Sequence, residues 1–316
     1  MNREEKKGVV QAVCISNARG TEKHTVPEGH FVVGFGIEGD AHGGNWHRQV
    51  SLLSRDKVEE FNARGAGVED GAFGENLVVS GLDFRTMPVG TRLHSGNVVL
   101  EITQIGKECH SHCAIYRRMG ECIMPREGVF ATVIKEGVIR PGDEMTVEEP
   151  LPDRPLQAAV LTLSDKGARG ERTDESGPAA KEILEKDGYE VVELLLIPDE
   201  PEQLKAQLIR LADSRQVDLI LTSGGTGFSL RDQTPEATME VAHRNAPGIA
   251  EAIRYRSIEK TDRAMLGRGV SVIRGKTLIV NLPGSPKAVR ESLGFVLGSL
   301  RHGLEILRGS ASECGR

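Results

Sequence analysis

Aromatic residues are scarce in this chain of 316 residues. They make up 4% of the sequence, and Trp46 is the single tryptophan. Proteins that bind single-stranded nucleic acid stack the bases on aromatic side chains, so this shortage argues against that function. It also means that any core is built mainly from Val, Leu, Ile and Ala side chains.

An excess of positive charge is missing as well. Residues 1–150 hold 17 Lys and Arg against 22 Asp and Glu, and residues 151–316 hold 23 against 24. Because domains that bind a phosphate backbone usually carry a basic excess, we expect no nucleic-acid partner. No apolar run approaches the roughly 20 residues that cross a bilayer, and the charged N-terminus MNREEKK precedes no apolar segment. The sequence therefore predicts a cytoplasmic protein with no membrane partner.

Cysteines are few and odd in number. Five cysteines, three of them within residues 109–122, do not form the framework of a secreted disulfide-stabilised domain. We expect the thiols to be reduced.

A proline-rich segment divides the chain. Pro150, Pro152 and Pro155 fall within six positions, and prolines so close together favour extended backbone. A chain of this length commonly holds two domains. We predict domains at residues 1–150 and 156–316.

The N-terminal half has the pattern of β structure. Short apolar runs are interrupted by glycines, and the best helix candidate is 54–63, where Ser54 can cap and Val58 and Phe61 share a face. The pattern predicts a mostly antiparallel β barrel with one or two helices. The expected strands are 9–15, 49–53, 76–79, 91–93, 98–105 and 129–133.

The C-terminal half alternates between strand and helix signals. This alternation predicts an α/β fold, a three-layer sandwich with a mainly parallel sheet that contains a right-handed βαβαβ unit. Ser176 and Ser285 are placed to cap helices. The expected strands are 158–163, 191–197, 217–221 and 277–281, and the expected helices are 178–186, 201–212 and 286–307.

Glycine-rich turns follow two of these strands. One turn covers residues 222–227, and another, 281–287, leads into the last helix. Backbone amides in such turns and at helix N-termini favour anions. Ligands of open α/β sheets bind beyond the carboxyl ends of the strands, so both turns and the segments 162–165 and 197–199 should lie at one edge. Neither turn has the spacing of a P-loop NTPase or a Rossmann dehydrogenase.

Acidic side chains occur in the same segments. Asp165, Asp199 and Asp232 are what a magnesium–nucleotide site needs, because Mg²⁺ is commonly held by one or two carboxylates plus substrate phosphates. The alternative is that the glycine loops are ordinary turns and that Asp232 caps the helix beginning near Pro235, although Thr234 is better placed to cap.

Six motifs of the C-terminal half occur in the order of a known family. Residues 157–307 contain T-x-S-D-K, R-x-D-x-S-G-P, I-P-D-E, S-G-G-T-G, R-D-x-T-P-E-A and L-P-G-S-P-K. In this they resemble the molybdopterin adenylyltransferases of MogA/MoaB type and their molybdopterin-binding fold. The resemblance implies a step of molybdenum cofactor biosynthesis, the transfer of AMP from MgATP to the terminal phosphate of molybdopterin with release of pyrophosphate.

The same resemblance implies the site residues. By that resemblance Asp199 and Asp232 are the catalytic acidic residues, and we expect Asp232 to hold Mg²⁺ while Asp199 seats the metal or the attacking phosphate. The substrate-binding residues that it implies are Ser164, Asp165, Gly224, Gly225, Thr226, Gly227, Thr234, Glu251, Pro283, Gly284, Ser285 and Lys287.

Partners and alternative functions follow from the same motifs. The family implies a homo-oligomer, a trimer, and a molybdenum insertase or a molybdoenzyme as partner. One alternative is a non-catalytic protein that binds or carries molybdopterin or molybdenum cofactor, and another is a hydrolase on a related pterin-binding fold. The presence of both Asp199 and Asp232 favours the enzyme.

The densest group of soft metal ligands is residues 109–113, Cys-His-Ser-His-Cys. A structural zinc site usually draws four ligands from two separated pairs, and the second pair is missing here. We favour a single accessible thiolate at Cys109 over a zinc site, because Lys107 and His110 can lower the pKa of this thiol. The alternative is a buried, inert cysteine, which we favour for Cys14.

The motifs around this cysteine resemble the MOSC domain, over about residues 8–147. They are G-I-E-G-D-A-H, H-R-Q-V-S-L-L-S, F-G-E-N-L, M-P-V-G-T-R-L, G-K-x-C-H and M-P-R-E-G. The resemblance implies a β-rich domain that handles sulfur or molybdenum cofactor, with Cys109 as the family's cysteine. Arg48 and Arg126 offer bidentate donors to a pterin phosphate. The candidate pocket residues are Asp40, His42, His47, Arg48 and Arg126.

Overall fold

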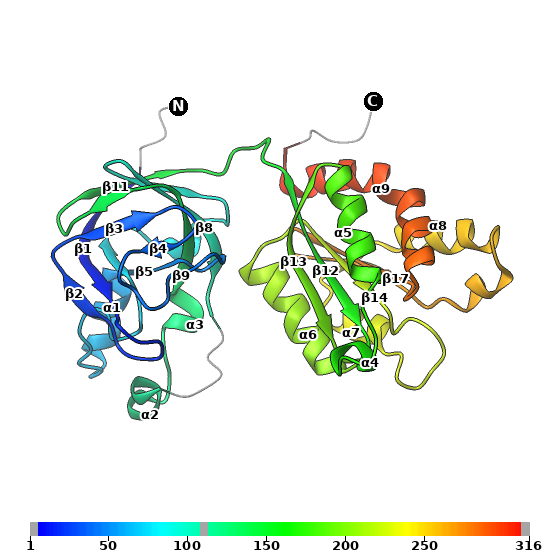
Figure 1. The fold of residues 1–316 in the computed structure, drawn as a ribbon, viewed down its shortest axis with the longest axis horizontal. Coiled ribbons are helices and arrows are strands. Elements are labelled where there is room, and N and C mark those ends of the chain that lie inside the picture. Colours follow the sequence, from blue (N-terminus) through cyan, green and yellow to red (C-terminus); the bar gives the residue numbers. More distant parts are fainter. Residues whose placement is uncertain (1–5, 108–112, 311–316) are drawn as a thin grey trace. The chain divides into compact units, whose positions relative to one another are not determined.

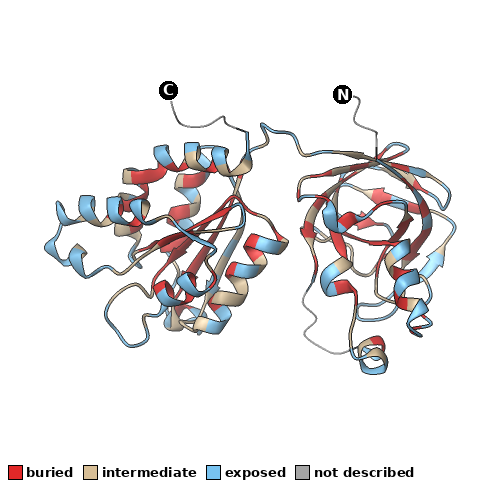
Figure 2. Cartoon of the chain, turned by 180° about the vertical axis from the view of Figure 1, so that it is seen from behind, coloured by how far each residue is buried: buried red, intermediate tan, exposed pale blue. Residues whose placement is uncertain are grey.

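The computed structural model describes residues 6–107 and 113–310. The chain divides into two compact units, Met1–Leu151 and Pro152–Arg316 (Figure 1). Figure 2 shows that the buried residues of each unit line its strands and the inward faces of its helices. Each unit has its own hydrophobic core. Within the described residues, no helix is both long and apolar enough to span a membrane.

The N-terminal unit is a closed β barrel. Seven strands form the ring β11–β7–β8–β9–β5–β6–β1, and β1 pairs with β11 to close it. All of these pairs are antiparallel except β5 with β6. The strands are β1 (Lys7–Ile15), β2 (His24–Val26), β3 (Gly29–Val32), β4 (Gly36–Ile37), β5 (Val50–Ser54), β6 (Leu77–Ser80), β7 (Arg92–Ser95), β8 (Val98–Ile105), β9 (Val129–Lys135), β10 (Gly137–Ile139) and β11 (Glu144–Glu148).

The barrel core follows from alternation along the strands. In β8 every second residue is buried, and Val98, Leu100 and Ile102 join the central cluster. The predicted mostly β barrel is therefore confirmed, and the strands that sequence patterns missed are short pieces of two to five residues.

The helices of this unit are short. They are α1 (Arg55–Ala63), α2 (Ala114–Met119), α3 (Met124–Glu127) and the 3₁₀ turn η1 (Phe84–Thr86). Val58 and Phe61 are buried from α1 as expected, but the predicted capping by Ser54 is wrong. Ser54 is buried as the last residue of β5, and its hydroxyl makes no capping bond to the helix.

The C-terminal unit is a three-layer α/β sandwich, as predicted. Its sheet has the order β13–β12–β14–β17–β16–β15, with the first four strands parallel and the last two antiparallel. The strands are β12 (Leu156–Leu163), β13 (Tyr189–Ile197), β14 (Leu219–Ser223), β15 (Arg244–Asn245), β16 (Ser271–Arg274) and β17 (Thr277–Leu282).

Helices cover both faces of this sheet. Alternate residues of β12 point to opposite sides, so Ala158 and Val160 pack with α5, α8 and α9, whereas Ala159 and Leu161 pack with α6 and α7. The helical elements are α4 (Asp165–Ala168), α5 (Ser176–Lys186), α6 (Pro201–Ile209), η2 (Arg210–Ser214), α7 (Thr234–Glu240), α8 (Pro247–Ile258), η3 (Asp262–Leu266) and α9 (Pro286–Arg308).

Candidate active site

Four parallel strands end at one edge of the C-terminal sheet. The strand register aligns Leu163 with Ile197, Thr162 with Ser223, and Ser223 with Leu282. The loops that follow these strands therefore start at the same level, as the parallel order of the strands requires. These are the segments in which the sequence places its candidate site.

Two of these loops exchange hydrogen bonds. The backbone amide of Asp165 donates to Oδ2 of Asp199 at 2.9 Å, and the amide of Asp199 donates to Oδ1 of Asp165 at 3.0 Å. Arg231 from the next loop donates to both oxygens of Asp165 and to Glu200 at 2.9 Å. The pKa of Asp165 is thus kept below the usual range, first by the bond with Asp199 and then by the ion pair with Arg231.

The carboxylates of Asp199 and Asp232 lie against the glycine loop. A β-carbon at Gly225 would be 3.5 Å from Oδ1 of Asp199, and one at Gly227 would be 2.9 Å from Oδ2 of Asp232. Burial raises the pKa of Asp199, and the charges of Asp165 and Asp232 raise it further. A cation between these carboxylates would relieve that repulsion.

The carboxylate oxygens of Asp199 and Asp232 are of the ligand type that Mg²⁺ prefers. No group of three or more His, Cys, Asp or Glu side chains that could hold a metal occurs in the described part of the chain. Two carboxylates are nevertheless sufficient where substrate phosphates supply the remaining ligands.

Capping of α7 differs from the expectation. Thr234 is the first residue inside the helix, and the cap position falls on Gln233, whose side chain makes no capping bond. Asp232 does not cap it either, because its Oδ2 accepts from the amide of Ser229 at 3.1 Å within the preceding turn. This turn leaves the Asp232 carboxylate beside Gly227.

Two glycines are required by the backbone of the loop. Gly224 has φ +106° and Gly225 has φ +62°, a region that other residues rarely adopt. A β-carbon would also overlap the Leu163 carbonyl at the first position and the Thr234 hydroxyl at the second. The loop can therefore present its backbone only because both positions are glycine.

The loop before α9 lies directly beside this one. Ser223 donates its hydroxyl to the carbonyl of Pro283 at 3.0 Å, and a β-carbon at Gly284 would be 3.3 Å from Cα of Gly224. Ser285 caps α9 as predicted, accepting from the amide of Ala288 at 3.2 Å. The start of α9 therefore faces the same edge as the glycine loop.

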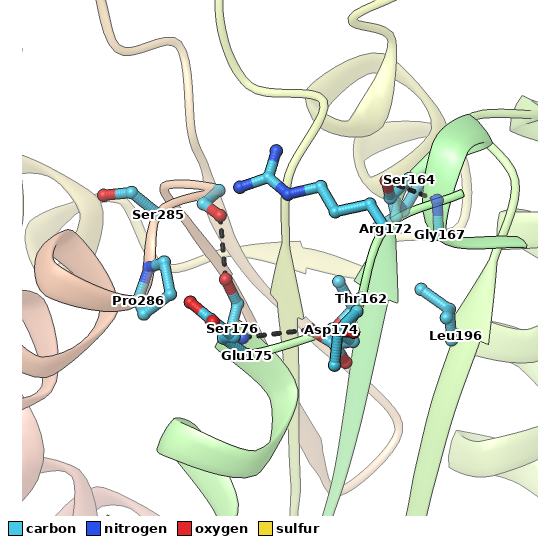
Figure 3. A pocket seen from close by; sticks show the side chains of 13 residues that line it. Thr162, Ser164, Gly167, Arg172, Asp174, Glu175, Ser176, Leu196, Ser285 and Pro286 are labelled. Atoms are coloured by element: carbon cyan, nitrogen blue, oxygen red, sulfur yellow. Dashed lines mark hydrogen bonds between the residues drawn. The ribbon is translucent and has the colours of Figure 1, made fainter. Parts of the chain in front are cut away.

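A cavity of about 310 Å³ opens next to these loops. Figure 3 shows its walls, with Arg172 extending toward the loop that carries Ser285. Sequence reasoning placed Ser164, Gly284 and Ser285 in the site, and it placed the segments 162–165 and 281–287 at this edge. It gave no site role to Gly167, residues 172–176 or Leu196. The lining residues are Thr162, Leu163, Ser164, Gly167, Arg172, Thr173, Asp174, Glu175, Ser176, Leu196, Gly284, Ser285 and Pro286.

The start of α5 forms one wall of the cavity and corrects a second capping prediction. The helix begins at Ser176, and Oδ1 of Asp174 accepts from the amides of Ser176 at 2.9 Å and Gly177 at 3.1 Å. The Ser176 hydroxyl donates instead to the carbonyl of Gly284 at 2.8 Å (Figure 3). The motif D-x-S-G was the available signal for this arrangement, since Asp is a strong capping residue.

Three further predicted residues do not line the cavity. Thr226 accepts from the amide of Arg268 through its carbonyl, whereas Lys287 is exposed on α9 and Glu251 is exposed on α8. Neither of the last two lines the cavity, and their roles stay predictions.

In the N-terminal unit, Asp40 is the centre of a buried polar cluster. Its Oδ2 accepts from Lys23 and, at 2.9 Å, from Asn76, while its Oδ1 accepts from the amide of Ser16 at 3.1 Å. Burial would raise the pKa of Asp40, but the bonds from Lys23 and Asn76 outweigh it and hold the pKa at about 2. Nδ1 of His42 lies 3.6 Å from Oδ1 of Asp40, and burial together with the Lys23 charge lowers the pKa of His42.

The other candidates of this unit are less enclosed. Arg48 stacks its guanidinium 4.7 Å from the ring centre of Trp46, and His47 bonds Gln104 at 2.9 Å. Arg126 is exposed and donates to Glu121 at 3.3 Å. The side chains of Arg48 and Arg126 are thus held by separate groups.

The predicted thiolate, Cys109, and its neighbours His110 and His112 lie outside the described residues. Cys113 is exposed, and Cys14 is buried in β1. Burial raises the pKa of the Cys14 thiol to about 12. Cys14 is therefore buried as expected, and its low reactivity stays a prediction.

Two family models match separate parts of the chain. Residues 159–302 match the model of a probable molybdopterin binding domain, and residues 38–146 match that of the MOSC domain. These matches fall in the C-terminal and N-terminal units respectively.

Curated relatives resemble the C-terminal unit. The molybdopterin adenylyltransferase of Helicobacter pylori strain 26695 is 37% identical over 157 residues, which cover 49% of this chain and 89% of the relative. That of Escherichia coli K12 is 41% identical over 140 residues, which cover 44% and 72%. Among solved structures, the molybdopterin biosynthesis enzyme MoaB from Thermus thermophilus is 50% identical and covers 49% of this chain and 97% of its own, with a TM-score of 0.47.

Proposed function

The chain belongs to the molybdopterin adenylyltransferase family through its C-terminal unit, and its N-terminal unit is a MOSC domain. From this we propose how residues of the C-terminal unit transfer AMP to molybdopterin. The C-terminal unit is a molybdopterin adenylyltransferase of molybdenum cofactor biosynthesis. The proposal concerns MgATP, the site residues and the part played by the MOSC domain.

The proposed reaction is a direct displacement at the α-phosphorus of ATP. An oxygen of the terminal phosphate of molybdopterin attacks that phosphorus, the bond to the β-phosphate oxygen breaks, and pyrophosphate leaves with the bonding electron pair. Phosphoryl-type transfer of this kind depends on positioning and charge neutralisation, so no protein nucleophile is needed.

The observation that supports this proposal is the placement of two carboxylates against a glycine loop. Asp199 and Asp232 flank Gly225 and Gly227, where the backbone is bare of side chains. Asp232 would hold the magnesium ion that ATP brings, and Asp199 would seat the ion or the attacking phosphate. Amides of the glycine loop and of the start of α9 would bind the phosphates.

The decisive experiment is to incubate the purified protein with MgATP and molybdopterin. Adenylated molybdopterin and pyrophosphate should form in equal amounts. Release of AMP or ADP without an adenylated pterin would identify a hydrolase, and tight pterin binding without turnover would identify a carrier.

For the MOSC domain we propose handling of molybdenum cofactor or sulfur. A buried polar cluster supports this proposal. In it Asp40 accepts from Lys23 and Asn76, and the Asp40 carboxylate lies beside the His42 ring. Cys109 would be the thiolate of this unit. Substitution Cys109→Ser should abolish persulfide loading or weaken cofactor binding, and a variant unchanged in both would refute the proposal.

Covalent linkage of the two units would raise the effective concentration of the adenylated product near the MOSC domain. We also propose that the protein forms a homo-oligomer and that its partner is a metal insertase or a molybdoenzyme.

A further inference from the structure

The loop between β14 and α7 carries the Asp232 carboxylate, and the tip of this loop is largely exposed. Phe228 is 69% exposed and Leu230 is 94% exposed, although both are apolar. Within the loop, the amide of Ser229 donates to Oδ2 of Asp232 at 3.1 Å, and the amide of Asp232 donates to the carbonyl of Ser229 at 2.9 Å. These bonds shape the turn but do not tie it to the sheet. The position of Asp232 therefore depends on polar contacts from other parts of the fold.

Arg268, which follows η3, makes three hydrogen bonds to this loop. Its backbone amide donates to the carbonyl of Thr226 at 3.0 Å, and its Nε donates to the carbonyl of Gly227 at 2.7 Å. Its Nη2 donates to the carbonyl of Asp232. The guanidinium of Arg268 thus joins the two ends of the turn formed by residues 227–232.

The two carbonyls that this guanidinium binds belong to the residues that set the Asp232 carboxylate. One is the carbonyl of Asp232 itself. The other is that of Gly227, where a β-carbon would be 2.9 Å from Oδ2 of Asp232. A shift of either carbonyl would move the carboxylate relative to the glycine loop. In a reaction that depends on positioning, a misplacement of about 1 Å can lower the rate by about 100-fold.

The other contacts of Arg268 are also to protein groups. Its Nη1 donates to Glu236 in the first turn of α7, so each of the three guanidinium nitrogens has a protein partner. Arg268 is also absent from the walls of the cavity beside the glycine loop. An arginine that grips a phosphate does so with two parallel N–H donors. The contacts of Arg268 instead fit a residue that holds the loop.

Arg231 also links the loop to a neighbouring segment, but by a more exposed contact. Its Nη2 donates to the carboxylates of Asp165 and Glu200, and 54% of the Arg231 side chain is exposed. Exposed ion pairs contribute little to stability because water and salt screen them. Arg268, which is 32% exposed and binds backbone carbonyls, is therefore the stronger restraint on the loop.

A further arginine holds the segment that contains Arg268. Arg254 on α8 donates from Nε to the carbonyl of Gly267 at 2.9 Å and from Nη2 to the carbonyl of Gly269 at 3.0 Å. These glycines are the residues immediately before and after Arg268. Arg254 thus fixes the chain where it returns from α8 and η3, which project from the body of the unit (Figure 1). The contacts form a continuous series from α8 through Arg268 to Asp232.

We propose that Arg268 is a positioning residue that holds the Asp232 carboxylate beside the glycine loop, and that Arg254 supports it by fixing residues 267–269. This inference rests on the proposed function, which assigns Asp232 to the magnesium ion of MgATP. Both arginines act through the backbone of the loop and not through contact with a substrate.

Steady-state kinetics of adenylation test this role. We expect Arg268→Gln to lower kcat by about 10–100-fold and to change the KM for molybdopterin by no more than about twofold. Arg268→Lys offers a single ammonium in place of the fork, so its kcat should lie between the two. Arg254→Gln should lower kcat by about 3–10-fold, because it acts one step further away. Arg263→Gln, at an exposed position of η3, is the matched control and should keep the kcat of the original chain.

A raised KM for MgATP with an unchanged kcat in Arg268→Gln would mean that this residue binds substrate, and the inference would then be wrong. A double variant asks whether Arg268 acts through Asp232. When Arg268→Gln is added to Asp232→Asn, kcat should fall by no more than about twofold further. A further loss as large as that of Arg268→Gln alone would contradict the inference.

Hydrogen exchange followed by mass spectrometry gives a readout that needs no turnover. In Arg268→Gln the amides of residues 226–232 should exchange about fivefold faster or more, while those of β14 and β17 keep their rates. Unchanged exchange in the loop would overturn the inference whatever the kinetics show. If Arg268→Gln does not fold, Arg268→Lys and Arg254→Gln are held to the same criterion.

The transferase proposal fails separately from this inference. If the original chain makes no adenylated pterin, the proposed transfer is wrong. Faster exchange of residues 226–232 in Arg268→Gln, with Arg263→Gln unchanged, would still assign to Arg268 the holding of the loop.

Discussion

Asp165 and Asp199 hold each other's loops in place, since the amide of each donates to the carboxylate of the other at 2.9 and 3.0 Å. The contact joins the segment after β12 to the segment after β13. It fixes the Asp199 carboxylate on the side of the glycine loop, near enough to Asp232 for the charge of Asp232 to raise its pKa. The position of this predicted catalytic carboxylate is therefore set by the segment that follows the neighbouring strand β12.

Loss of one carboxylate should abolish catalysis without unfolding the protein. We expect Asp232→Asn to lower kcat for adenylation of molybdopterin by about 100-fold or more, because charge neutralisation at the phosphates is lost. The melting temperature should be nearly unchanged, since Asp232 accepts one bond from Ser229. Asp213→Asn is the matched control, because Asp213 pairs with Arg274 outside the site. Wild-type kcat in Asp232→Asn would remove this residue from the mechanism.

The glycine loop should not tolerate a methyl group. Gly224→Ala places a β-carbon against the Leu163 carbonyl at φ +106°, so we expect destabilisation by about 1–3 kcal/mol and a raised KM for ATP. A β-carbon at Gly298 on α9 would meet no atom of the described residues within 4 Å, so Gly298→Ala should stabilise by roughly 0.5–1 kcal/mol. Denaturant titration and steady-state kinetics compare the two. Equal stability of both variants would contradict the prediction.

The buried pair of Lys23 and Asp40 makes a prediction for the barrel. Both side chains are 1% exposed, so Lys23→Met leaves an unpaired buried carboxylate and should cost about 3–5 kcal/mol of unfolding free energy. The double variant Lys23→Met with Asp40→Asn should recover part of that loss. Chemical denaturation of Lys23→Met, of Asp40→Asn and of the double variant gives the coupling energy, and additive effects would mean that the pair does not act as a unit.

Glu75 should make the barrel less stable as the pH rises. Burial raises the pKa of Glu75 to about 7 from its ordinary 4.5, against the bonds from the amides of Gly71 and Phe73. The folded state therefore keeps a proton that the unfolded chain has lost. The contribution of Glu75 to stability is fully present below about pH 4.5, decreases as the pH rises to about 7, and is constant above that, with a total loss of roughly 3 kcal/mol.

Glu75→Gln tests that dependence, because a neutral amide cannot titrate. Between pH 4.5 and 7.5 its unfolding free energy should change less than that of the original chain. The measurement is denaturant-induced unfolding of the barrel at each pH. The exposed Glu69→Gln should leave the slope unchanged. An unchanged slope in Glu75→Gln would assign the pH dependence to another group.

Much of the site edge could be predicted because parallel strands impose it. The segments holding Asp165, Asp199 and Gly224 follow consecutive strand signals, and the fold brings them to one edge. The capping of α9 by Ser285 was equally readable, since Ser followed by Pro is a strong helix start.

Other features depend on contacts that no local pattern reports. Ser176 was expected to cap α5, but it bonds Gly284, 108 positions away, and Asp174 caps in its place. The ion pair of Arg231 with Asp165 is likewise a product of the tertiary fold. So is the burial of the Thr162 hydroxyl, which has no hydrogen-bond partner among the described residues. In the barrel, strands of two to four residues such as β4 and β10 are too short for alternation to reveal.

The close approach of Gly284 to Gly224 restricts which side chains these two positions can carry. The two backbones are in contact at that point, so a side chain at either glycine would push the two turns apart. Substitutions in the cavity wall at positions such as Thr162 and Arg172 would leave that junction in place.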